Sequence, residues 1–134
     1  MKELLLEKAF EAMKNAYTPY SHYNVGACVK TKDGKLFIGA NIENASYGAT
    51  NCGERSAVFA CYSHGYRQED IEGIAIVTDG AILAGPCGIC RQVLSELLLP
   101  DTPIYLSNKK EEMTTNIKEL MPLMFGKKDL DDRL

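Results

Sequence analysis

The sequence predicts a three-layer α/β/α sandwich over a mixed sheet, and three observations support this. The chain has 134 residues, the usual size of one domain, and no linker or repeat divides it, so we expect a single domain over residues 1–134. Amphipathic helical patterns alternate with short apolar runs, and an Asp-Gly pair predicts a hairpin. The strand–helix–strand order after the hairpin predicts parallel crossovers, with helices on both faces of the sheet.

The first third of the chain predicts a helix, a hairpin and a loop. Residues 2–16 place apolar side chains on one helical face, and Pro19 lies beyond its end. Residues 25–29 alternate apolar side chains with smaller or polar ones, and residues 36–40 form the return strand after the turn. Residues 41–51 are rich in Asn, Ser and Gly and predict an irregular loop.

The remainder predicts helices and strands in alternation. A helix begins near Gly53, with its apolar residues spaced at i, i+3, i+4 and i+7. The continuous apolar run at 73–78 is typical of a strand covered on both faces. A second helix with the same spacing follows Pro86, and residues 103–107 form another strand. Asn116 begins a capping-box pattern and is expected to open a short last helix.

Composition and charge argue against several classes of function. The net charge of −3 offers no basic surface for a nucleic acid. No apolar run is long enough to span a bilayer, and charged residues interrupt the N-terminal "MKELLLEKAF", which predicts a helix and not a signal peptide. We therefore expect a cytoplasmic protein without membrane or nucleic-acid partners, in which the five cysteines are thiols or metal ligands.

Cys87 and Cys90 in "GPCGICRQVL" form a pair open to several interpretations. It could be a disulfide, a redox couple, half of a structural zinc site or part of a catalytic one. A thioredoxin-like couple would have no third thiol nearby, and a zinc ribbon needs a second full pair of this kind, which the chain lacks. The pair therefore needs a partner from elsewhere in the sequence.

Cys52, in "TNCGER", opens the other predicted helix. If the sheet brings the two helix starts together, three thiols converge where helix dipoles and free backbone N–H groups favour thiolates. Zn²⁺ with three protein ligands keeps one position open, which is typical of a catalytic site. Cys28 and Cys61 lie on apolar faces and are expected to be buried, inert thiols.

Glu54 follows Cys52 by two residues, at the head of the same helix. One interpretation is a carboxylate that the helix dipole stabilises. The other is a proton carrier beside a metal-activated water.

The motifs "CGER" and "PCGICRQ" resemble the signature of zinc deaminases. The chain as a whole is similar to cytidine deaminases of the small homotetrameric kind. "YSHYNVGA" resembles their substrate loop, "NIENASYG" their ribose and base segment, and "LMPLMF" their C-terminal element. These blocks stand in family order and cover almost the whole chain. Two residues depart from the family, which usually has Ala where this chain has Gly53 and Pro where it has Asn24.

The resemblance implies a role for each matching residue at the metal. Cys52, Cys87 and Cys90 would hold one Zn²⁺ per chain, and Glu54 would carry protons. Arg55 would donate hydrogen bonds to the ligand sulfurs and withdraw part of their negative charge. The alternative for Arg55 is a solvated charge on the helix, or a salt bridge across a subunit contact.

The resemblance also implies contacts with the substrate. The residues concerned are Asn41, Glu43, Tyr23, Gly53, Tyr47 and Phe125. Asn41 and Glu43 would bind the ribose 3′-hydroxyl, Tyr23 would line the sugar and base pocket, and Gly53 would offer backbone groups to the base. Tyr47 and Phe125 would reach the site of a neighbouring subunit in a homotetramer with shared active sites.

The implied reaction is zinc-dependent hydrolytic deamination of cytidine and 2′-deoxycytidine to uridine and 2′-deoxyuridine plus ammonia, a step of pyrimidine salvage. Two alternatives remain. One is a related deaminase of a nucleoside-like antibiotic such as blasticidin S, against which Glu43 counts because it suits a ribose contact. The other is a non-enzymatic zinc-binding scaffold, which has no use for a proton carrier such as Glu54.

Overall fold

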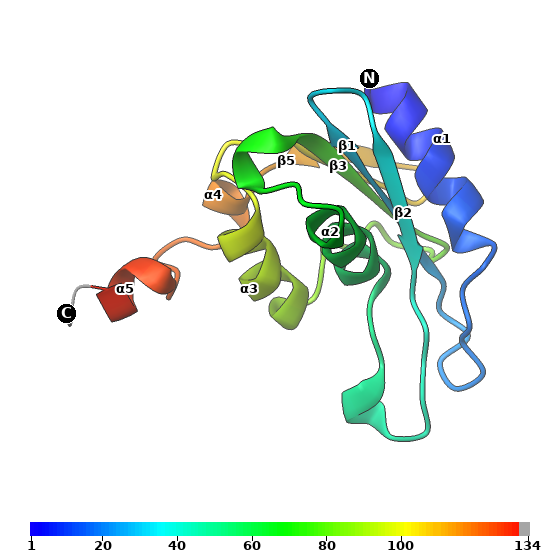
Figure 1. The fold of residues 1–134 in the computed structure, drawn as a ribbon. Coiled ribbons are helices and arrows are strands. Elements are labelled where there is room, and N and C mark those ends of the chain that lie inside the picture. The colour runs from blue at the N-terminus through cyan, green and yellow to red at the C-terminus, as the bar shows by residue number, and fades with distance from the viewer. Residues whose placement is uncertain (132–134) are drawn as a thin grey trace.

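The computed structural model describes residues 1–131, in which helices lie on both faces of one five-stranded sheet (Figure 1). The strand order is β2-β1-β3-β4-β5. β3 and β4 pair in parallel, and every other neighbouring pair is antiparallel, so the sheet is mixed as predicted. The strands are Val25–Thr31 (β1), Leu36–Ala40 (β2), Ile71–Thr78 (β3), Ile104–Ser107 (β4) and Glu112–Thr115 (β5).

Two apolar clusters hold the helices on the sheet. The helices are Lys2–Met13 (α1), Gly53–Ser63 (α2), Gly88–Leu97 (α3), Ile117–Leu120 (α4) and Lys127–Asp131 (α5). In the central strand β3, Ala75 and Val77 pack toward α1, whereas Ile74 and Ile76 pack toward α2 and α3. The prediction that residues 73–78 are covered on both faces is therefore confirmed. Among residues 1–131, no helix has both the length and the apolar character needed to cross a membrane.

The sequence did not predict β5 or α5, and the first helix ends at Met13 and not at residue 16. β5 is an edge strand whose first three side chains are exposed, so it shows no apolar alternation. At the start of α4, the Asn116 side chain accepts a hydrogen bond from the Glu119 amide at 2.9 Å, as expected of a cap. Exposed or very short elements leave little apolar periodicity in a sequence.

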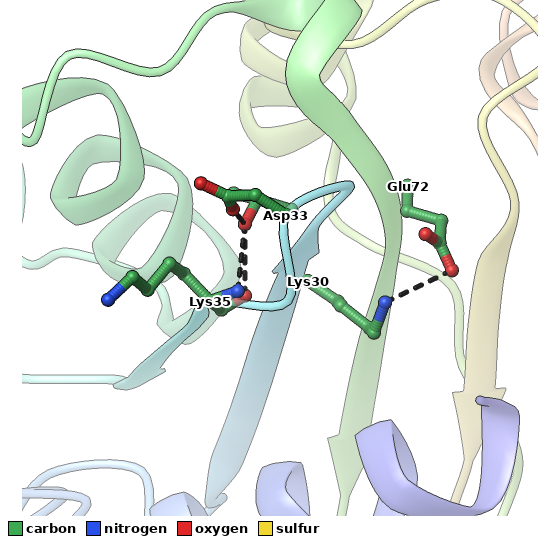
Figure 2. Close-up of polar contacts among 5 residues, drawn as sticks. Lys30, Asp33, Lys35 and Glu72 are labelled. Atoms are coloured by element: carbon green, nitrogen blue, oxygen red, sulfur yellow. Dashed lines mark hydrogen bonds and ion pairs between the residues drawn. The ribbon is translucent and has the colours of Figure 1, made fainter.

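Polar contacts fix the turn between β1 and β2 (Figure 2). Gly34 adopts a φ of +91°, which suits glycine, as the Asp-Gly pair predicted. The Thr31 hydroxyl donates to the Asp33 carboxylate and accepts from the Lys35 amide, and its hydrogen bond to Asp33 holds the pKa of that carboxyl below its usual range. Because the turn sets the register of the hairpin, these contacts also place the far end of β2, where the loop toward α2 begins.

Two glycines allow the helices to approach the sheet closely. A Cβ atom on Gly26 would lie 2.1 Å from the carbonyl oxygen of Ala9 in α1. On the other face, a Cβ atom on Gly39 would lie 2.5 Å from the Ala57 nitrogen and 2.5 Å from the Gly53 oxygen, both in α2. The start of α2 therefore rests directly on the backbone of β2.

We expect Gly39→Ala to lower the free energy of unfolding by about 1–3 kcal/mol or more, because the added methyl must push two backbone segments apart. Urea denaturation measures this change. Gly73→Ala is the matched control, since a Cβ atom there would lie 3.5 Å from its nearest neighbours, an ordinary contact. Equal stability of the two variants would contradict this account of α2 packing.

Candidate metal centre and active site

The two helices whose starts carry Cys52, Cys87 and Cys90 begin at the same edge of the sheet. β2 and β3 are both antiparallel to β1, so they run in the same direction and their last residues lie at one edge. α2 follows β2 in the chain and α3 follows β3. The strand directions therefore bring the N-termini of the two helices together, which is the condition for the three thiols to converge.

Three cysteine sulfurs meet at these helix starts. Cys52 is the residue before α2, Cys87 is the residue before α3, and Cys90 lies in the first turn of α3. The three sulfurs lie within 4.8 Å of one another, and those of Cys87 and Cys90 are 3.5 Å apart. With Zn–S bonds of about 2.3 Å, the sulfurs of a tetrahedral site lie about 3.8 Å apart. The observed spacing fits Zn²⁺, and three sulfurs leave its fourth position open.

The protonation of the cluster also suits a cation. The Cys52 sulfur accepts hydrogen bonds from the Cys90 thiol and from Arg55, and these lower the pKa of Cys52 to about 5 against the opposing effect of burial. The hydrogen bond to Cys52 raises the pKa of Cys90, which keeps its proton. A divalent cation can replace such shared protons, because it stabilises thiolates more strongly than a hydrogen bond does.

Arg55 lies against the cluster in the first turn of α2. Its Nη2 atom donates to the Cys52 sulfur at 3.4 Å. Its Nε atom is buried and has no hydrogen-bond partner within residues 1–131. The guanidinium of this partly buried side chain therefore lies against the Cys52 sulfur, so its charge offsets part of that of the thiols.

Glu54 lies beside the thiols and is 4% exposed. Its Oε1 atom has no hydrogen-bond partner among the described residues. Burial, reinforced by the nearby Cys52 charge, raises the pKa of the Glu54 carboxyl to about 7. A carboxyl that titrates near neutral pH can both accept and donate a proton, which is what general acid–base catalysis requires.

A pocket of about 480 Å³ lies at this edge of the sheet, and Cys52, Cys87 and Glu54 are part of its lining. This volume falls in the usual range for small-molecule sites. Six of the residues singled out in the sequence line it: Tyr23, Asn41, Glu43, Cys52, Glu54 and Cys87. The structure thus brings Cys52, Cys87, Glu54 and three of the predicted substrate contacts to one cavity. Cys90 is fully buried and is not part of the lining.

Asn41 and Glu43 hold the segment that borders the pocket. The sequence did not reveal this positioning role. Asn41 accepts from the Val25 amide at 2.9 Å and donates to the Tyr23 carbonyl at 2.8 Å. Glu43 accepts from the backbone amides of residues 20 and 21, both at 3.1 Å, and from the Ser21 hydroxyl. The Ser21 hydrogen bond lowers the pKa of Glu43, so the carboxylate stays charged while it holds the segment.

Tyr47 and Phe125 lie outside this pocket in the single chain. Tyr47 is 78% exposed and borders an adjoining hollow with Tyr20, whose ring centroid lies 6.4 Å away. This hollow shares Ser21, Glu43 and Thr50 with the pocket. Phe125 is 59% exposed, and its carbonyl accepts a hydrogen bond from the Gln92 side chain at 3.0 Å. Neither aromatic residue is part of the lining of the pocket that contains Glu54 and the thiols of its own chain.

Gly53 stands where the resemblance described above implies alanine, and the structure shows why glycine fits. A Cβ atom at this position would lie 3.2 Å from both the Val25 side chain and its carbonyl oxygen, and 3.3 Å from the Ala40 Cα atom. These contacts are tighter than ordinary packing allows without a shift. The Val25 side chain therefore occupies the space that a methyl group on residue 53 would need.

Cys28 and Cys61 are fully buried, one in each apolar cluster, as predicted. Burial raises the pKa of each thiol to about 11, so both are protonated at neutral pH. They behave as small apolar side chains and serve as controls for the three converging thiols.

Comparison with known proteins gives a consistent result. Residues 1–106 match the family described as "Cytidine and deoxycytidylate deaminase zinc-binding region". The chain is 46% identical over 132 residues to a cytidine deaminase of Halalkalibacterium halodurans, with 98% of each chain covered. It is 40% identical over 129 residues to a cytidine deaminase of Sporosarcina psychrophila, with 96% of this chain and 93% of the relative covered. It resembles the crystal structure of cytidine deaminase from Burkholderia pseudomallei with a TM-score of 0.89 and 42% identity, over 93% of this chain and 99% of that one.

We expect the purified protein to hold one Zn²⁺ per chain and Cys87→Ala to lose it, because two sulfurs alone bind the ion far more weakly. Metal analysis after dialysis against a chelator measures the difference. Cys28→Ala is the matched control and should keep its zinc, since Cys28 lies in the apolar cluster between α1 and the sheet. Full zinc content in Cys87→Ala would refute the three-thiolate site.

Proposed function

The chain belongs to the cytidine and deoxycytidylate deaminase family, and from this membership we propose that it hydrolyses cytidine and 2′-deoxycytidine to uridine and 2′-deoxyuridine, with release of ammonia. The observation that carries the proposal is the buried Glu54 carboxyl beside three converging thiols, at a pocket of about 480 Å³. A scaffold that only stores zinc has no need for a carboxyl with a pKa near 7 at its metal.

The protein's own groups account for the proton transfers. Cys52, Cys87 and Cys90 would hold Zn²⁺, which when bound acts as a Lewis acid and lowers the pKa of water. Glu54 accepts a proton from the attacking water and delivers it to N3 of the cytosine ring. It then carries the second proton to the departing 4-amino group, so one water enters and one ammonia leaves. Arg55 keeps electron density on Cys52 low through its hydrogen bond to that sulfur.

We propose that Asn41 and Glu43 bind the ribose 3′-hydroxyl and that Tyr23 and the backbone of Gly53 contact the base. Asn41 and Glu43 already hold backbone groups of the bordering segment. Each keeps spare capacity, because an amide has two N–H groups and a carboxylate about four acceptor positions. Both side chains can therefore bind a hydroxyl group without releasing the segment.

The proposed assembly is a homotetramer with shared active sites. Tyr47 and Phe125 are large aromatic side chains that remain exposed in the single chain and lie outside its pocket. Burying a group of this size is worth about 1.5–3 kcal/mol, which favours a partner surface over water. Each ring would complete the pocket of a neighbour.

The cellular setting that we propose is the cytoplasm, with the reaction serving pyrimidine salvage. All five cysteines are free thiols, and the three at the metal must stay reduced to bind it. Reducing compartments keep thiols in that state.

We expect Glu54→Gln to keep its fold and zinc but to lose about 10²–10⁴-fold in the rate of cytidine deamination, because an amide cannot carry a proton. The fall in cytidine absorbance and the release of ammonia measure the rate. Glu72→Gln, which changes a partly exposed carboxylate paired with Lys30 at the far end of β3, should retain full activity. A loss of less than tenfold in Glu54→Gln would exclude the proposed role.

A second prediction concerns the shared sites. Phe125→Ala should raise KM for cytidine while zinc content stays at one per chain, since the ring would reach a neighbour's pocket. Met113→Ala removes another exposed apolar side chain, on the edge strand β5, and should leave KM unchanged. Light scattering measures the size of the assembly. A monomer with full activity would rule out active sites shared between subunits.

A further inference from the structure

The loop after β3 lies against the segment that carries Tyr23. Asp79, the first residue beyond β3, accepts a hydrogen bond from the Asn24 amide at 2.9 Å and another from the Asn24 side chain at 2.7 Å. The Asp79 amide donates in return to the Asn24 carbonyl at 3.3 Å. The Thr18 hydroxyl donates to the Asn24 side-chain oxygen at 2.7 Å. Asn24, the neighbour of Tyr23, is thus fixed through both its backbone and its side chain.

Gly80, the next residue, lies directly beneath the Tyr23 ring. A Cβ atom on Gly80 would lie 2.9 Å from Tyr23 Cε2 and 3.3 Å from its hydroxyl oxygen. The φ of Gly80 is not in the left-handed region, where the described glycines are Gly34 and Gly65. The backbone at Gly80 could therefore accept alanine, and it is the ring of Tyr23 that requires the missing side chain.

The loop that carries Gly80 is itself held in place by a side-chain amide. Asn108 is 6% exposed, and its side-chain amide donates to the Gly80 carbonyl at 3.2 Å and to the Ala81 carbonyl at 3.4 Å. Because a buried amide fixes this backbone, added bulk on residue 80 would displace the free end of the Tyr23 ring before it displaced the loop.

We propose that Asp79 and Gly80 are positioning residues that form a seat for Tyr23 and so set one wall of the pocket. Tyr23 lines the same cavity as Cys52 and Glu54, whereas Asp79 and Gly80 are absent from its lining and act through the tyrosine. The inference rests on the proposed function, since it concerns how the nucleoside is held. It also explains why this chain has Asn24 at a position where the resemblance implies proline. A proline would have neither the backbone N–H nor the side-chain amide that donate to Asp79.

The first test is Gly80→Ala. It should raise KM for cytidine about two- to tenfold through displacement of the aromatic wall, with kcat, zinc content and Tm little changed. Gly73→Ala is the matched control on β3, because a Cβ atom there would lie 3.5 Å from Cε2 of another tyrosine, Tyr105. It should leave KM unchanged.

A double-mutant cycle separates the seat from a general structural effect. In a Tyr23→Ala background, Gly80→Ala should have no further effect on KM, because the ring that it displaces is gone. Likewise, Asp79→Ala and Asn24→Ala should each raise KM. The KM of the double variant should be no higher than that of the worse single variant. Glu72→Ala, which breaks the ion pair with Lys30 that Figure 2 shows, should not change KM.

Two results would overturn the seat: an unchanged KM in Gly80→Ala, or an equal rise of KM with and without the Tyr23 ring. If the wild-type protein does not deaminate cytidine, the proposed function is wrong and no KM can be compared. NMR then tests by itself whether Gly80 positions the Tyr23 ring. The ring signals of Tyr23 should then shift in Gly80→Ala and stay in place in Gly73→Ala. Unshifted signals in both variants would refute it.

Discussion

The meeting of two helix N-termini at one edge of the sheet is the constraint on which the site depends. β2 and β3 run in the same direction because each is antiparallel to β1, so the helices that follow them start side by side. Gly39 lets α2 rest on the backbone of β2, which brings Cys52 within reach of Cys87 and Cys90. A small displacement of α2 would remove one sulfur and the Glu54 carboxyl together, because both lie at its start.

Neighbouring groups at this edge have pKa values shifted in opposite directions, and this difference suits their proposed roles. Hydrogen bonds lower the pKa of Cys52 to about 5, whereas burial raises that of Glu54 to about 7. One group is charged and ready for a cation, and the other exchanges protons near neutral pH. The two buried core thiols, Cys28 and Cys61, show what burial does without such hydrogen bonds: their pKa rises to about 11.

Local patterns predicted the layers and the two helix starts that carry the three thiols and Glu54, because each of these depends on residues close in the sequence. The convergence of the thiols depends on the sheet, which brings the two helix starts together. The edge strand β5 could not be predicted, since its exposed Glu112 and Met113 show no apolar alternation. The contact between Asn24 and Asp79 spans 55 residues and leaves no local signal. The same holds for Gly80, whose importance is a space that only the folded Tyr23 ring fills. Contacts between distant loops thus escape sequence reasoning even where the motifs are clear.

We propose that one zinc ion, held by Cys52, Cys87 and Cys90 beside Glu54, makes the protein a nucleoside deaminase. Titration of Zn²⁺ into the metal-free protein, with cytidine deamination followed at each addition, tests it most directly. The account predicts no activity without metal and a linear rise that ends at one ion per chain. Activity in the metal-free protein, or a plateau at another ratio, would contradict it.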